Sequence, residues 1–178
     1  MYGAYLDTLI LRFDARMSSH LRLDAVYWLD EAVWASTANG SDAPAPAIAA
    51  AHARGLQVLW IPYFDAGGAA KWKEFGFDAA WQQPNYFFDG SVPRSRLDSA
   101  VRRADKAGMG LELEFDKRIL ADSGSRRRLR ESVRVVRRAR NRSVVVYDGA
   151  GALYGLLTST QPELRDAGIS VVDLLCER

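Results

Sequence analysis

The sequence has little of what metal and disulfide sites need: one cysteine, Cys176, and two histidines, His20 and His52. A lone cysteine forms no disulfide within the chain and no cysteine metal site, and it leaves the compartment open. The histidines lack the HExxH spacing of zinc proteases. Neither GxGxxG nor GxxxxGK[ST] follows an expected strand, which argues against a nucleotide-binding fold. We therefore expect no metal and no cofactor.

Long apolar runs are also absent. No segment approaches the roughly 18 apolar residues of a membrane span. Residues 1–13 carry Asp7 inside an amphipathic pattern, unlike the uniform apolar stretch of a secretion signal. The sequence therefore predicts no membrane partner and no signal peptide in this chain, and it leaves open whether the intact protein is secreted.

What the sequence does contain is an alternation of apolar strands and amphipathic helices along its 178 residues. Helices are expected at 2–17, 46–54, 69–75, 94–107 and 125–140, and strands at 23–29, 56–63, 77–83, 110–116 and 143–147. The tail, 153–175, fits one or two short helices or a last strand. Strands joined by helices imply a parallel sheet, so we expect one α/β domain over 1–178, either doubly wound or a barrel.

The strand at 110–116 alternates acidic and apolar residues. Period two places Leu111, Leu113 and Phe115 on one face, and the opposite face carries the carboxylates of Glu112, Glu114 and Asp116. Buried carboxylates are costly unless they are protonated, paired or hydrogen-bonded. The pattern therefore indicates an active-site strand, with a strand that has one face in water as the alternative.

Polar and aromatic residues gather where the expected strands end. Aromatic rings beside carboxylates and amides suit a sugar, whose C–H faces stack on rings while its hydroxyls need fixed partners, and barrels place active sites at these ends. Each of these residues also has a structural interpretation. The tryptophans fit core positions, the amides next to Pro84 fit a distorted strand end, and the tyrosines fit buried positions where the hydroxyl group forms a structural hydrogen bond. The candidates for sugar binding are Trp28, Trp60, Tyr63, Gln83, Asn85, Tyr86 and Tyr147.

Five segments carry a family resemblance: YWLDE at 27–31, WIPYF at 60–64, WKEFGFD at 72–78, QPNYFF at 83–88 and GLELEFD at 110–116. With them, residues 5–148 resemble the bacterial family catalogued as domain of unknown function 4855. The resemblance implies a TIM-barrel-type domain of the glycoside-hydrolase kind. A closed barrel usually needs about 250 residues, so we expect one that is incomplete at its N-terminal end. Its open edge beside 23–29 would be covered by another subunit or by upstream residues.

A glycosidase needs two carboxyl groups, one as acid and one as nucleophile or base. Glu114 is the first candidate, with Glu112 deeper in the lumen and Asp116 nearer the mouth. Asp30 and Glu31, at the end of another strand, are expected to form the opposite wall. Residues i and i+2 are roughly 6.6 Å apart along a strand, which leaves retaining, inverting and substrate-assisted mechanisms open. The expected partner is a carbohydrate, bound by an enzyme or by a non-catalytic barrel.

An arginine-rich segment at 126–142 offers a different function. It has the charge expected of a surface for nucleic acid or another polyanion. The net charge of the whole chain is only +2, and Leu129, Val133 and Val136 require one buried face. We therefore expect a solvated outer helix rather than a nucleic-acid surface, and an acidic polysaccharide fits this charge as well.

Overall fold

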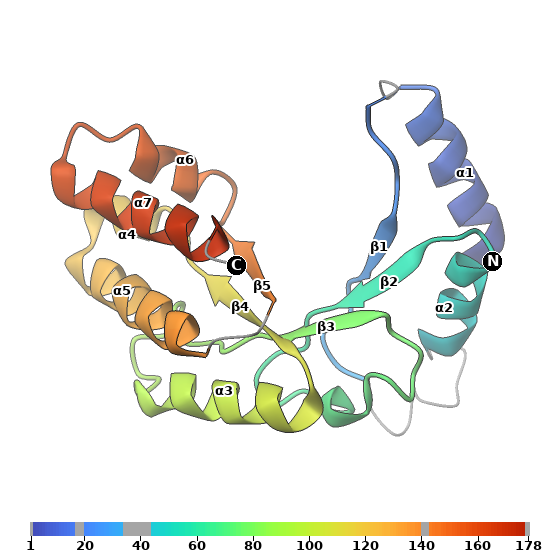
Figure 1. The fold of residues 1–178 in the computed structure, drawn as a ribbon, viewed down its shortest axis with the longest axis horizontal. Coiled ribbons are helices and arrows are strands. Elements are labelled where there is room, and N and C mark those ends of the chain that lie inside the picture. Colours follow the sequence, from blue (N-terminus) through green and yellow to red (C-terminus); the bar gives the residue numbers. More distant parts are fainter. Residues whose placement is uncertain (1, 17–19, 34–43, 140–142, 177–178) are drawn as a thin grey trace. The chain divides into compact units, whose positions relative to one another are not determined.

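The computed structural model describes residues 2–16, 20–33, 44–139 and 143–176 (Figure 1). The strands are β1 Ala25–Trp28, β2 Gln57–Trp60, β3 Ala79–Gln82, β4 Gly110–Glu114 and β5 Val144–Tyr147. The helices are α1 Tyr2–Asp14, α2 Pro44–His52, the 3₁₀ helix η1 Ala69–Lys71, α3 Ser95–Ala107, α4 Arg118–Ala121, α5 Ser123–Arg138, α6 Ala152–Leu157 and α7 Pro162–Cys176.

The five strands pair in chain order, and every pair is parallel. Helical segments connect successive strands (Figure 1). This confirms the expected α/β class and a TIM-barrel-type repeat, in which the described residues supply five strands against the eight of a closed barrel. The chain divides into two compact units, 1–80 and 81–178, with the division inside β3.

The first unit holds β1, β2 and the start of β3, with α1 packed on α2. Its core contains Trp60, which is fully buried and stacks on Phe77 with ring centroids 4.8 Å apart. Asp78 joins two elements of this unit. Its Oδ2 accepts a hydrogen bond from the Val58 N–H at 2.7 Å and lies 2.8 Å from Nε2 of His52, at the end of α2.

In the second unit β4 lies between β3 and β5, and α3 and α5 contact it. The chain leaves α3 at Gly108, whose φ of 65° is a left-handed conformation that favours glycine. Asp122 caps α5 by accepting a hydrogen bond from the Ser125 N–H. Leu129, Val133 and Val136 form the buried stripe of α5 that the period of 3.6 predicts.

The observed boundaries differ from the expected ones mainly at element ends. The expected strands and helices exist, with each of the five strands shorter by one to four residues, and 69–75 contains only the 3₁₀ turn η1. The sequence did not indicate α4, and the tail forms α6 and α7. Met17, Arg140 and Arg142 lie outside the described residues.

Candidate functional site

Two glutamates of β4 are buried, Glu112 in the middle of the strand and Glu114 at its C-terminal end. The exposed fraction is 5% for Glu112 and 3% for Glu114. Leu111, Leu113 and Phe115, which alternate with them, are almost fully buried as well. The strand therefore has no face in water, which excludes the alternative of a half-solvated strand. Burying ionisable groups on a central strand is costly, so the fold stabilises these glutamates or uses them.

Trp81 of β3 lies on the same face of the sheet as Glu112 and Glu114. Trp81 pairs in register with Gly110, and a Cβ placed on Gly110 would lie 2.2 Å from Trp81 Cδ1. The indole Nε1 donates to Ser143 Oγ at 3.0 Å. The Trp81 ring therefore lies over Gly110, and by period two this is also the face of Glu112 and Glu114. Trp81 forms the floor of the site at the N-terminal end of β4.

Two amides follow β3 on the same side. Continuing the alternation from Trp81 places Gln83 on the face of Glu112 and Glu114. Asn85 Nδ2 donates to Gln83 Oε1 at 2.8 Å, so the two amide side chains lie together across Pro84. Asn85 has φ 48°, a left-handed conformation that asparagine tolerates better than most residues. Both amides are partly exposed, so their hydrogen-bonding groups are accessible.

Aromatic rings stand at the other side of β4. Tyr147, on β5, is the register partner of Glu114, and 52% of it is exposed. The exposed ring of Phe88 lies edge-on to Tyr147, with centroids 6.0 Å apart. Tyr147 and Phe88 together present accessible apolar surface next to the C-terminal end of β4. Tyr147 is one of the residues expected from the sequence at a strand end, whereas Phe88 was not among them.

Asp116, the third acid of the pattern, has a different environment. Both of its carboxylate oxygens lie 3.0 Å from Arg118 Nε, and Oδ1 also accepts from the Arg118 N–H at 2.9 Å. The Arg118 guanidinium also lies over the rings of Phe87 and Phe88, at 5.5 and 5.3 Å from their centroids. The carboxylate of Asp116 is thus engaged at the start of α4, which leaves Glu112 and Glu114 as the stronger catalytic candidates.

Tyr86 and Arg128 hold the loop that carries these amides and rings. The buried Tyr86 hydroxyl donates to Glu131, and burial together with this hydrogen bond raises the pKa of Tyr86. The Arg128 guanidinium lies 3.7 Å from the centroid of the Tyr86 ring. It donates to the backbone carbonyls of Tyr86, Asp89, Gly90 and Val92. These contacts favour a structural role for Tyr86 and identify Arg128 as the residue that organises 86–92.

The candidates in the first unit are described separately. Trp60 is core, and its Nε1 donates to the Asp30 carbonyl at 2.8 Å. Asp30 is exposed, and its Oδ1 accepts from the Ala32 N–H at 3.3 Å. Glu31, Tyr63 and Trp28 are partly exposed. These contacts give Trp60 a packing role and leave the side chains of Asp30 and Glu31 accessible.

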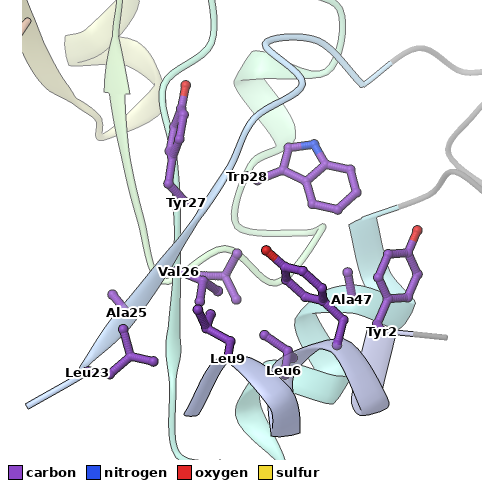
Figure 2. Close-up of a pocket in the computed structure, with 11 residues that line it drawn as sticks. Tyr2, Leu6, Leu9, Leu23, Ala25, Val26, Tyr27, Trp28 and Ala47 are labelled. Carbon is purple, nitrogen blue, oxygen red and sulfur yellow. The ribbon is translucent and has the colours of Figure 1, made fainter. Parts of the chain in front are cut away.

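Trp28 also lines an apolar cavity of about 410 Å³ that the sequence analysis missed. Figure 2 shows the side chains of Leu6 and Leu9 rising from α1 toward Val26 of β1. Residues of α2 and β2, Ala47 and Val58, complete the lining. The cavity therefore lies along β1, which pairs only with β2 in the part of the chain that the structure describes.

Nowhere in 2–16, 20–33, 44–139 or 143–176 do three or more His, Cys, Asp or Glu side chains cluster as metal ligands would. Within the same ranges no helix is long and apolar enough to cross a membrane.

Comparison with protein families matches residues 1–172 to the family described as Domain of unknown function (DUF4855). The match extends the resemblance of 5–148 to nearly the whole chain. Comparison with curated proteins finds no match.

Proposed function

The chain belongs to the DUF4855 family, and we propose that it is a glycoside hydrolase domain acting on an oligosaccharide or polysaccharide. The observation that carries the proposal is the pair of buried glutamates, Glu112 and Glu114, on one face of the central strand β4. Amides from the end of β3 and a tyrosine from the end of β5 flank this face.

Glu114 is the proposed proton donor or nucleophile, because it is the last residue of β4 and its register partner, Tyr147, is exposed. Glu112 is the second carboxyl group. Two carboxyl groups close together in a dry environment do not readily ionise at the same time. That property suits a pair in which one group donates a proton and the other stays ionised. Asp116, Asp30 and Glu31 follow as candidates in that order.

The residues around the glutamates have the chemistry to hold a sugar. The Gln83 and Asn85 side chains offer both donors and acceptors to hydroxyl groups. The rings of Tyr147 and Phe88 supply apolar surface for C–H faces. The rise of roughly 6.6 Å between Glu112 and Glu114 lies at the lower limit of the about 6.5 to 9.5 Å found in inverting enzymes, and the about 5 to 5.5 Å of retaining enzymes is within reach of a small tilt of the two side chains. The spacing along the strand therefore leaves both outcomes open.

The experiment is hydrolysis of a panel of polysaccharides by the wild type and by Glu114→Gln, with release of reducing ends as the measurement. Glutamine keeps the shape of the side chain and removes the proton donor or nucleophile, so turnover should fall by at least about a hundredfold, while substrate affinity is largely retained. Glu74→Gln, at an exposed glutamate, is the matched control. Equal turnover by wild type and Glu114→Gln would rule out this role and move the test to Glu112.

A non-catalytic carbohydrate-binding domain is the second candidate, because the amides and rings serve binding without chemistry. In that case no polysaccharide releases reducing ends with the wild type, and Glu114→Gln changes affinity alone.

The structure gives less support to nucleic-acid binding through 126–142. Arg128 is buried and bonded to backbone carbonyls, and Arg126 donates to the Ile119 and Leu120 carbonyls. These contacts attach two of the arginines to the backbone of the fold, and Arg128 is buried there. Salt-sensitive binding to nucleic acid that Glu114→Gln leaves unchanged would support the polyanion surface instead.

A further inference from the structure

A small cavity beside the end of β4 combines cationic and aromatic groups. Its volume is about 250 Å³, and the residues that line it include Arg118, Arg127, Arg128, Phe87 and Phe88. At about 30 Å³ per water molecule in the liquid, this space corresponds to roughly eight waters. Such a volume admits one ring-sized group of a ligand rather than a long stretch of polymer.

Of the three arginines that line this cavity, Arg127 is the one whose guanidinium group can pair with a ligand. Arg118 is paired with Asp116, and the Asp122 carboxylate accepts the capping hydrogen bond from the Ser125 N–H. Arg128 is bonded to carbonyls. Arg127 is exposed and forms no ion pair within the part of the chain that the structure describes. Asp116 pairs with Arg118, and the carboxylate of Asp89 interacts electrostatically with Arg128, so among the described residues Arg127 is the lining arginine that remains for a ligand.

The cavity adjoins the proposed catalytic strand. Phe88, in its lining, contacts the ring of Tyr147, which is the register partner of Glu114. Arg118 is joined to Asp116, which lies two residues after Glu114. A sugar chain with one residue at Glu114 therefore has this cavity next to it.

We propose that the cavity is a subsite for an acidic sugar, whose anionic group pairs with Arg127 while its ring packs on Phe88 beside Tyr147. The inference rests on the proposed function and names its substrate class: polysaccharides that carry carboxylate or sulfate groups. A planar carboxylate matches the fork of donors on a guanidinium. Nucleic acid fits less well, because its binding requires several cations that contact successive phosphates. Arg126 and Arg128 instead donate hydrogen bonds to backbone carbonyls of this chain.

The test is calorimetric binding of three oligosaccharides to the full chain carrying Glu114→Gln, so that cleavage does not consume the ligand. The probes are hexagalacturonate for carboxylate, a sulfated dextran oligosaccharide for sulfate, and cellohexaose as the neutral reference. Adding Arg127→Gln should weaken binding of the preferred acidic probe about tenfold. Arg130→Gln removes an exposed arginine of the same helix outside the cavity and is the matched control. Phe88→Ala tests the ring contact separately.

Preference for an acidic probe over cellohexaose, lost with Arg127→Gln and kept with Arg130→Gln, supports the subsite. This result stands even if the wild type cleaves nothing, so a failure of the hydrolase proposal is distinguishable from a failure of the subsite. Hydrolysis of neutral glycans with no effect of Arg127→Gln overturns the subsite and keeps the enzyme. Tighter binding of single-stranded DNA, weakened equally by Arg127→Gln and Arg130→Gln, also overturns it, because that is non-specific polyanion binding.

Discussion

At the scale of single residues, Gly110 is the residue whose lack of a side chain matters most to the site. A Cβ there would lie 2.2 Å from Trp81 Cδ1 and 2.5 Å from the Ser143 carbonyl oxygen. Neither atom can move far, because Trp81 is hydrogen-bonded to Ser143 and the carbonyl belongs to the backbone. The floor of the site therefore depends on glycine at this position.

Gly110→Ala should lower the free energy of unfolding by about 1 to 3 kcal/mol, the usual cost of overpacking a filled interior. Urea denaturation followed by tryptophan fluorescence measures it. Gly90→Ala is the matched control, because a Cβ at Gly90 meets no atom within 4 Å. Equal stability of the two variants would contradict the placement of the Trp81 ring over Gly110.

The sequence indicated which side chains of β4 share a face, and it did not indicate what surrounds them. The alternation at 110–116 shows which side chains share a face, and strand ends point to Gln83, Asn85 and Tyr147. The placement of the Trp81 ring over Gly110 depends on the register of β3 and β4, and no local sequence pattern determines that register. The role of Arg128 depends on contacts with residues some forty positions away, and nothing in the arginine run distinguishes it from its neighbours.

At the scale of elements, Asp78 connects the end of α2 with the start of β2. Burial raises the pKa of its carboxyl group, but the hydrogen bonds from the Val58 N–H and His52 outweigh burial, and the net pKa is lowered. A carboxyl group with a depressed pKa in the folded state stabilises the fold above its unfolded value of about 3.9. That stabilisation is lost as the pH falls through the folded pKa.

Asp78→Asn should therefore be less stable than the wild type at pH 7. The difference in the free energy of unfolding should narrow below about pH 4, where the unfolded chain begins to take up a proton at Asp78, and it should be lost as the pH falls through the lower pKa of the folded state. Urea denaturation at pH 7, 5 and 3 measures the difference. Asp14→Asn, at an exposed carboxylate of the same unit, is the matched control. A difference between Asp78→Asn and wild type that stays constant down to pH 3 would show that ionised Asp78 does not stabilise this junction.

Element types were predictable where the hydrophobic period is strong, and element ends were not. The stripe of α5 and the alternation of β4 identify those elements directly. The short α4 has no period to detect in four residues, and its start is set by the contacts of Asp116 with Arg118. The register of parallel strands likewise comes from packing between distant segments.

At the scale of the whole molecule, β1 is the end of the strand order, and among the described residues it pairs only with β2. Tyr27 and Leu29, on and just after β1, are exposed, and Leu29 is 80% exposed. An open strand edge with apolar side chains is a template for pairing with another chain. The sequence analysis anticipated such an edge at 23–29.

We expect the chain to self-associate at micromolar concentration and Leu29→Lys to weaken that association, because a charge next to the edge opposes strand pairing. Sedimentation velocity over a range of concentrations measures this. Tyr154→Lys, at a side chain 73% exposed on α6, is the matched control. A wild type that stays monomeric at high concentration would show that another copy does not cover β1.

Because Arg128 holds the loop at 86–92 through backbone carbonyl groups, the method used to measure the rigidity of this loop matters. The guanidinium bonds to carbonyl oxygens, so these bonds do not themselves protect the N–H groups of the residues they fix. Amide hydrogen exchange reports on N–H groups and would understate how firmly this loop is held. The exchange rate of the Arg128 Nε proton, which is bonded to the Tyr86 carbonyl at 2.9 Å, would report on it directly.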